Sequence, residues 1–358
     1  MDCFLRGWLC QQRCTLERAK VLQTSTQGDV HTAIATFRSD LFESWRREVD
    51  DAFLHDSTTT PSGRLTAHLV VAVVALVVIG GATRVMEAGL ACPDWPLCFG
   101  TLLPGRQMNI QVFLEWFHRL DAFVIGIALV VMATVSVLWR RSLPQWLPWM
   151  SGSLVLLVAL QGGLGALTVL QLLPSAVVTA HLALALTLVA LLSGLTQCLL
   201  QSTDGQPPWW WRPLSALALA GVVSQCLLGA RMATSWAAQR CLAGGEACRW
   251  LAWHRSAAAP VAGLVLLFVV VALLAGGWSR RQWPLLLSAV TLVATQVILG
   301  ITTLRLGLNQ PLVTVAHQLV AALLVGLLAA LLVRRPASVA VVPCSVVLDD
   351  SSLEPCHG

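Results

Sequence analysis

The sequence predicts an all-α, polytopic membrane protein whose eight transmembrane helices form two pseudo-symmetric four-helix bundles. Of its 358 residues, 56% are hydrophobic and only 11% are charged. The mean hydropathy is +0.73, which is typical of chains that have the bilayer as their main solvent. Motifs also recur between the two halves. Gly81-Ala82-Thr83-Arg84 has a counterpart in Gly229-Ala230-Arg231, and Gln161-Gly-Gly-Leu-Gly165 has one in Gln296-Val-Ile-Leu-Gly300.

Eight apolar segments are each long enough to cross a bilayer, which takes about 20 residues in a helix. Pairs of arginines follow the second, sixth and eighth segments. Arginine-rich loops stay in the cytoplasm. We therefore expect both termini to lie on the cytoplasmic side of a bacterial cytoplasmic membrane, and the loops after the first and fifth segments to lie on its outer side. The segments have approximate limits of 65–83, 114–138, 147–170, 175–199, 213–233, 253–277, 283–304 and 311–333.

The chain divides into four parts by composition. Residues 1–64 form a polar extension, 65–200 the first four-helix unit, 213–333 the second unit and 334–358 a cytoplasmic tail. Apolar residues at helical spacing over 31–53 are compatible with a short amphipathic helix. A disordered extension or an upstream start site explains the same composition.

Four histidines carry the functional prediction. His118 and His181 are 63 residues apart, and so are His254 and His317. Each lies near the outer end of an even-numbered segment, where an ionisable side chain is costly unless it is paired or liganded. Zinc would require further protein ligands, whereas haem iron can be held by one imidazole on each side of the macrocycle. We therefore expect one haem between the second and fourth segments and another between the sixth and eighth.

Four arginines lie near the outer ends of the segments, where haem propionates would require cations. Anchoring at the membrane interface by snorkelling is the alternative role. These candidates for propionate binding are Arg84, Arg119, Arg231 and Arg255.

Glu115 distinguishes the two halves. It lies three residues before His118, on nearly the same helix face, whereas Leu251 holds the corresponding position before His254. A carboxylate beside a porphyrin can accept a proton or stabilise developing positive charge. The alternative is an interfacial ion pair with Arg119.

Two pairs of cysteines lie in the outer loops: Cys92 with Cys98, and Cys241 with Cys248. In an oxidising compartment each pair can form a disulfide. Such a bond serves either as a structural staple or as a redox relay.

Together these residues resemble the haem A synthase family. The resemblance implies an oxidoreductase that converts the C8 methyl group of haem O to a formyl group by successive hydroxylations with water-derived oxygen, giving haem A for terminal oxidases. It covers about residues 66–334. The matching motifs are Thr83-Arg84 with Gly89-Leu90, the Cys92-Pro-Asp-Trp-Pro-Leu-Cys98 loop, Glu115-x-x-His118-Arg119, Gln161-Gly-Gly-Leu-Gly165 and the histidines at 181, 254 and 317.

The resemblance also implies roles for individual residues. His118 and His181 would bracket the haem O substrate, His254 and His317 would ligate a resident haem b, and Glu115 would be catalytic. The implied partners are the prenyltransferase that makes haem O, an unidentified electron acceptor and the lipid bilayer. Scattered arginines and a net charge of +5 argue against nucleic acid. A homo-oligomer is left open.

Other functions account for fewer of these features. A bis-histidine b-type cytochrome acting only in electron transfer is the main alternative, since it needs the four histidines but not Glu115. A thiol oxidoreductase would leave the histidines unexplained. A prenyltransferase would require aspartate-rich motifs, which the predicted segments do not contain.

Overall fold

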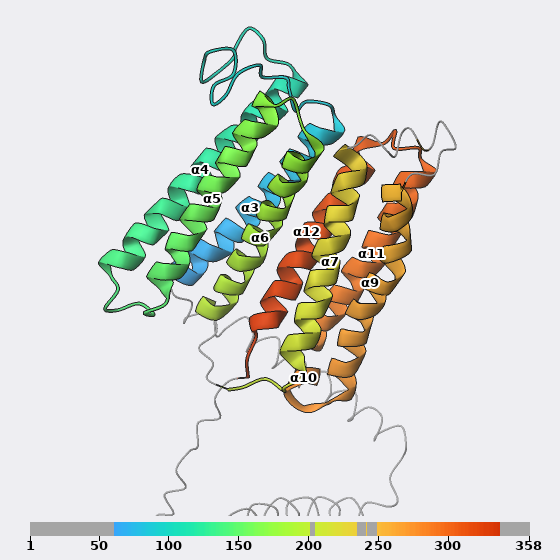
Figure 1. Cartoon of the computed structure of the whole chain (residues 1–358). Coiled ribbons are helices and arrows are strands. Elements are labelled where there is room, and N and C mark those ends of the chain that lie inside the picture. Colours follow the sequence, from blue (N-terminus) through green and yellow to red (C-terminus); the bar gives the residue numbers. More distant parts are fainter. Residues whose placement is uncertain (1–60, 201–204, 235–240, 242–248, 337–358) are drawn as a thin grey trace, which may run out of the picture. The chain divides into compact units, whose positions relative to one another are not determined.

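The computed structural model describes residues 61–200, 205–234, 241 and 249–336. Within these residues eight helices are long and apolar enough to span a membrane, which confirms the all-α, polytopic fold class (Figure 1). The helix expected over 31–53 lies outside the described residues. The spanning helices are α3 (Pro61–Val85), α4 (Ile110–Leu138), α5 (Leu147–Leu170), α6 (Ser175–Leu200), α7 (Trp211–Thr234), α9 (Arg249–Leu274), α11 (Trp283–Arg305) and α12 (Pro311–Val333), with a short α10 (Gly277–Arg281) before α11.

Among the predicted helix limits that shift in the structure, two have a clear local cause. The sixth segment ends at Leu274 rather than at 277, because Gly276 and Gly277 have φ values of +69° and +56°, a conformation that glycine adopts without steric cost. The second segment begins at Ile110 rather than at 114, where the side chain of Asn109 caps the helix by accepting from the backbone N–H of Val112 at 2.9 Å. His118 therefore lies in the third helical turn, deeper than expected.

The helices pack as neighbours within each half of the chain. In the first half α3 and α5 each contact both α4 and α6, and in the second half α9 and α12 each contact both α7 and α11. Helices α3, α6, α7 and α12 meet in the middle, where α12 packs against the other three (Figure 1). Because α12 packs against helices of both halves, the division into two four-helix units stays a prediction. The symmetry axis between the units stays a prediction.

Polar contacts at one end join the two halves. The Nη2 atom of Arg84 donates to the carbonyl of Ala233 at 2.7 Å. The hydroxyl groups of Ser175 and Thr234 are 2.7 Å apart, and Nη1 of Arg231 lies 3.2 Å from Oγ of Ser175. The ends of α3 and α6 are thus tied to the end of α7.

Gly81 of α3 lies against the side chain of Gln318 of α12. A Cβ atom built on Gly81 would lie only 1.5 Å from Oε1 of Gln318. The absence of a side chain therefore allows the Gln318 amide to lie against the α3 backbone, as small residues generally allow in membrane helix pairs.

We expect Gly81→Val to weaken the contact between the halves, because the valine must displace the Gln318 amide. Overpacking of this kind costs about 1–3 kcal/mol, measurable as a lower thermal unfolding midpoint of the purified protein. Gly126→Val is the matched control, since a Cβ there meets no atom within 4 Å. Gln318→Ala should restore most of the loss in the double variant, and a lack of rescue would contradict the contact.

Candidate functional site

His118 of α4 and His181 of α6 face each other. Their ring centroids are 6.5 Å apart and their planes are inclined by 64°. Two imidazoles on opposite sides of one metal ion have centroids about 6 Å apart, since each metal–nitrogen bond is about 2 Å. Buried polar atoms normally have hydrogen-bond partners, yet Nδ1 of both rings is buried without one. The pair therefore fits the axial ligands of a haem iron.

The second pair shares several of these features. Nδ1 of His317 is also buried without a partner, and His254 lies close enough to interact with it electrostatically. No group of three or more His, Cys, Asp or Glu side chains that could hold a metal ion occurs in the part of the chain that the structure describes. Two histidines per site suit a metal whose other ligands come from a macrocycle.

Each histidine ring lies against a glycine of a neighbouring helix. The missing side chains make room for the rings between the helices. The structure also shows that the glycine beside His118 is Gly80, so that Gly80 rather than Gly81 corresponds to Gly229. The pairs, with the distance from an ideal Cβ to the ring Cε1, are Gly80 and His118 at 2.8 Å, Gly165 and His181 at 3.5 Å, Gly229 and His254 at 3.0 Å, and Gly300 and His317 at 3.1 Å.

Three of the four histidines are each contacted by a different glutamine. Each of these glutamines lies one helical turn before the glycine that contacts the same histidine ring. Gln225 was not singled out from the sequence, although Gln-x-x-x-Gly at 225–229 repeats the spacing of the other two motifs. The contacts are Gln161 Nε2 to the His181 carbonyl at 3.0 Å, Gln225 Nε2 to the His254 carbonyl at 2.7 Å and to Nδ1 of His254 at 3.2 Å, and Gln296 Nε2 to Nε2 of His317 at 3.3 Å.

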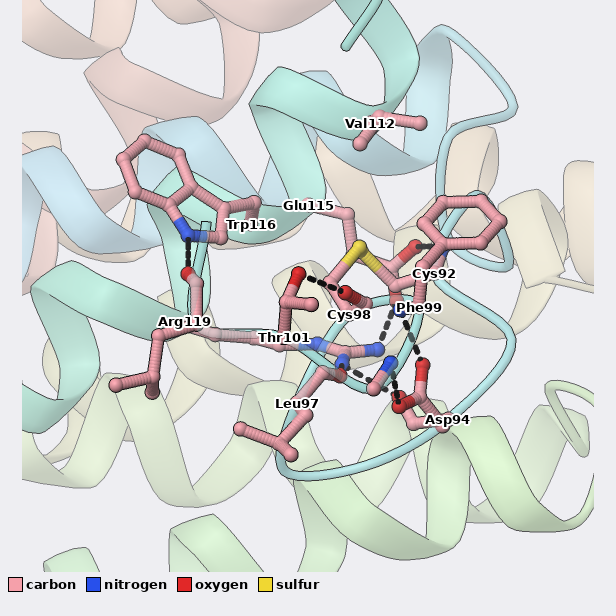
Figure 2. Close-up of a disulfide and its surroundings, with 12 residues drawn as sticks. Cys92, Asp94, Leu97, Cys98, Phe99, Thr101, Val112, Glu115, Trp116 and Arg119 are labelled. Atoms are coloured by element: carbon pink, nitrogen blue, oxygen red, sulfur yellow. Dashed lines mark hydrogen bonds and ion pairs between the residues drawn. A yellow bond between two sulfur atoms is a disulfide. The ribbon is translucent and has the colours of Figure 1, made fainter. Parts of the chain in front are cut away.

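The carboxylate of Glu115 is buried, with 4% of the residue exposed. Its Oε2 accepts from the backbone N–H of Cys92 at 2.8 Å, and its Oε1 accepts from Arg119 at 2.5 Å. Nη1 of Arg119 in turn donates to the carbonyls of Asp94 and Leu97, each at 2.6 Å. Figure 2 shows both α4 side chains reaching the loop in this way. Glu115 thus joins the helix of His118 to the loop that contains Cys92 and Cys98.

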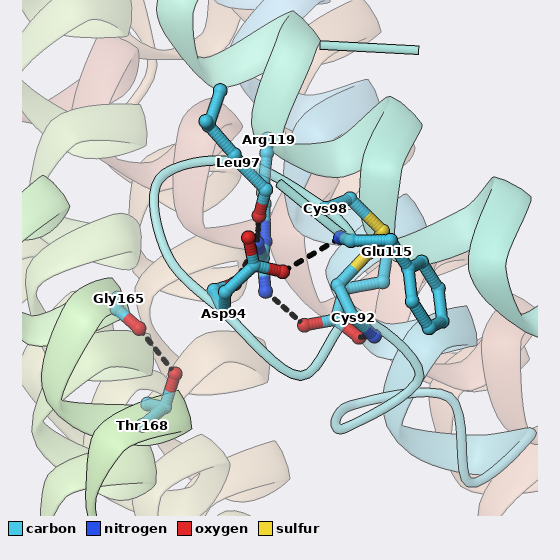
Figure 3. A network of polar contacts seen from close by, with 9 residues as sticks. Cys92, Asp94, Leu97, Cys98, Glu115, Arg119, Gly165 and Thr168 are labelled. Atoms are coloured by element: carbon cyan, nitrogen blue, oxygen red, sulfur yellow. Dashed lines mark hydrogen bonds and ion pairs between the residues drawn. A yellow bond between two sulfur atoms is a disulfide. The ribbon is translucent and has the colours of Figure 1, made fainter. Parts of the chain in front are cut away.

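The loop is closed by a disulfide and by Asp94. Cys92 and Cys98 are bonded, which confirms this predicted pair. The Asp94 carboxylate accepts from the backbone N–H groups of Phe99 at 2.7 Å and Gly100 at 2.8 Å. These bonds, that of Gly100 foremost, lower the pKa of Asp94 below its usual range. Figure 3 shows how this network lies beside α5, where Thr168 donates to the carbonyl of Gly165.

The remaining predicted residues have other surroundings. Arg231 lies over the ring of Trp250 at 5.1 Å, and Arg255 is exposed. Cys241 is disulfide-bonded, whereas Cys248 lies outside the described residues, so their pairing stays a prediction.

The fold and the site define a polytopic membrane protein with histidine pairs between its helices, an arrangement suited to embedded haem. A family model described as cytochrome oxidase assembly protein matches residues 63–329. The haem A synthase of Sphingopyxis alaskensis is 30% identical over 320 residues, which cover 73% of this chain and 88% of the relative. That of Rhizorhabdus wittichii is 30% identical over 326 residues, which cover 72% and 89%. The chain therefore belongs to the haem A synthase family.

A third similarity covers a short segment. A protohaem IX farnesyltransferase of Haloarcula marismortui is 39% identical to this chain over 72 residues, which cover 20% of this chain and 15% of the relative.

We expect Asp94→Ala to loosen the outer loop. Without the carboxylate the backbone N–H groups of Phe99 and Gly100 lose their acceptor, so a water-soluble phosphine should reduce the Cys92–Cys98 disulfide several-fold faster at pH 7. The extent of reduction can be followed by alkylation and mass spectrometry. Equal rates at pH 7 would show that Asp94 does not hold the loop.

The same experiment has a defined pH dependence. The folded-state pKa of Asp94 is lowered, so its stabilising effect is fully present above the unfolded value of about 3.9. It is lost only as the pH falls through the lowered folded-state pKa. The wild-type rate should therefore converge with that of Asp94→Ala only below about pH 4.

Proposed function

We propose that this protein is a haem A synthase, an oxidoreductase that converts the C8 methyl group of haem O to a formyl group. The observation that carries the proposal is the buried carboxylate of Glu115, which lies on the helix of His118 and is replaced by Leu251 in the second half. A cytochrome that only transfers electrons needs no buried carboxylate beside one of its histidine pairs. Membership of the family also supports the enzyme.

In this proposal each four-helix unit holds one haem. His118 and His181 bind the substrate haem O in the first unit, and their 6.5 Å centroid separation supports this role. His254 and His317 bind a resident haem b in the second unit. Haem b, when bound, supplies an iron centre that takes up and releases single electrons. The histidines hold each macrocycle at a fixed depth in the membrane.

Glu115 is the proposed catalytic residue. Each hydroxylation adds the oxygen of one water to the methyl carbon and releases two protons and two electrons, and the diol formed by two such steps loses water to give the aldehyde. A fixed carboxylate can accept these protons or stabilise positive charge that develops on the ring. The donors from Cys92 and Arg119 hold it in place before the reaction begins.

The arginines are proposed to bind haem propionates. Arg84, Arg231 and Arg255 have the charge and the donor geometry for this task. Arg119 stays a fourth candidate, although its guanidinium donates to two loop carbonyls and to Glu115.

The setting of the enzyme is also a proposal. We place it in the cytoplasmic membrane of a bacterium with both termini inside, which puts the disulfide loop on the oxidising side. The prenyltransferase that makes haem O is the proposed supplier of substrate, and the short similarity to a protohaem IX farnesyltransferase supports a functional link. A separate acceptor must take up the released electrons.

We expect His317→Ala, and likewise His254→Ala, to abolish the low-spin absorbance of haem b, because each removes one axial ligand of the resident haem. Absorption spectra of the purified variants, with haem extraction and chromatography, provide the measurement. An unchanged haem b spectrum in either variant would contradict the assignment of the second pair.

We expect Glu115→Gln to keep haem in both units but to lower haem A formation by a factor on the order of 10² or more, if Glu115 acts as a general base. Haem A in the membranes can be quantified by chromatography. Cys92 and Arg119 donate to different oxygens of Glu115, and a glutamine replaces one of these oxygens by an NH₂ donor, so the loop must be checked separately.

Two controls separate chemistry from loop structure. Leu251→Gln introduces the same amide at the corresponding place in the second half and should leave haem A formation near the wild-type rate. The rate of disulfide reduction in Glu115→Gln reports on the loop. If Glu115→Gln made haem A at the native rate, Glu115 would have no catalytic role.

A further inference from the structure

We infer that Leu76 makes the first histidine pair the one that releases its haem more readily. Each of the other three histidines is contacted by its own glutamine, and Leu76 stands where the glutamine for His118 would be. The inference rests on the proposed function, in which substrate haem enters and leaves the first unit while haem b stays in the second. Leu76 is then a positioning residue, because its apolar side chain offers His118 no hydrogen bond.

Leu76 occupies in α3 the place that Gln225 occupies in α7. Each precedes by four residues the glycine that lies against a histidine ring, and residues four apart share one face of a helix. The main chain of each also lies beside that ring. The corresponding sets are Leu76, Gly80 and His118 in the first half and Gln225, Gly229 and His254 in the second.

Gln225 contacts His254 through both its side chain and its main chain, although Nδ1 either accepts from the first or donates to the second, never both. Its Nε2 donates to the His254 carbonyl at 2.7 Å and lies 3.2 Å from Nδ1, while its own carbonyl lies 3.2 Å from the same Nδ1. A metal-bound imidazole keeps its orientation and tautomer when its second nitrogen has a fixed hydrogen-bond partner. His254 is therefore prepared to hold a metal through its other nitrogen.

His118 has no comparable support. Its Nδ1 is buried without a hydrogen-bond partner, as are those of His181 and His317, and the hydrocarbon side chain of Leu76 cannot supply one. On that side the ring lies against Gly80 and the main chain of Leu76, with no side-chain amide beside it. It is therefore the less firmly oriented ligand and the one from which haem separates first.

His181 completes the asymmetry within the first pair. It keeps its glutamine, since Gln161 Nε2 donates to the His181 carbonyl at 3.0 Å. One ligand of the first pair is thus anchored and the other is not, whereas both ligands of the second pair have a glutamine contact. This arrangement holds a haem in register yet lets it leave.

Reciprocal variants test the inference by haem release rather than by activity. The full-length protein loaded with haem is mixed with excess apomyoglobin, and the transfer of each haem is followed by absorbance and identified by chromatography. Leu76→Gln should slow release from the first unit, and Gln225→Leu should speed release from the second, each by about three- to tenfold, as expected for one net hydrogen bond. The Leu76→Gln, Gln225→Leu double variant should reverse the order of release.

A control variant separates position from polarity. Ala75→Gln adds the same amide at the exposed neighbouring position in α3, from which it cannot replace Leu76, and should leave both release rates unchanged. The low-spin spectrum of the untouched site shows that each variant has folded. If Leu76→Gln does not fold, Gln225→Leu still decides, because an unchanged release rate from the second unit overturns the inference.

The outcomes distinguish this inference from the proposed function. If the variants change release rates as expected but the protein makes no haem A, the positioning role stands and the enzyme assignment fails. If haem A is made and neither variant alters release, the positioning role of Leu76 and Gln225 is wrong while the enzyme assignment stands.

Discussion

The bilayer leaves an imidazole few ways to satisfy its polar atoms, and the described structure depends on how four imidazoles meet that constraint. Water is absent, so each ring nitrogen requires a partner from a neighbouring helix or from a ligand. Glycines at the contact points leave room for each ring beside a neighbouring helix, and Nδ1 of His118, His181 and His317 has no protein partner there. Helix spacing, the position of each glycine and the depth of each histidine are therefore set together.

The outer loop follows from a second burial problem on the same helix. A buried carboxylate is costly unless its oxygens are paired, and Glu115 obtains both partners from contacts that organise the loop. The guanidinium of Arg119 that pairs with Glu115 also donates hydrogen bonds to two loop carbonyls. Trp116 adds a third point of attachment by donating to the Leu102 carbonyl at 2.6 Å (Figure 2). Disulfide, loop and carboxylate consequently form one unit, so a change in the loop is transmitted to Glu115.

Much of this architecture could be predicted from the sequence because it depends on local patterns. Hydropathy gave all eight spans, and the spacing of the histidines and of Cys92 and Cys98 led to the pairings. The register between helices was less accessible. Comparing motifs aligned Gly81 with Gly229, whereas packing selects Gly80, because which of two adjacent glycines faces a ring depends on the rotation of α3 against α4. The contacts of Arg119 with loop carbonyls more than 20 positions away carry no sequence signal at all.

In the proposed function the first half binds a substrate and the second a cofactor, and the two kinds of site have opposing requirements. A cofactor site gains from tight and permanent ligation, whereas tight binding of substrate and product alike slows turnover without assisting the reaction. Around the first pair the chain has added a carboxylate, Glu115, and has a leucine, Leu76, where the second half has an amide. Around the second pair the carboxylate position is Leu251, and both histidines have glutamine contacts. Under the proposed function both differences act in the same direction: the first half would have the reactive carboxylate and the ligand without a glutamine contact, and the second would have two glutamine-contacted ligands and no carboxylate. The carboxylate is present in one half (Glu115 against Leu251) and the amide in the other (Gln225 against Leu76). Divergence of the halves without regard to function would not require these two differences to favour the same division of roles.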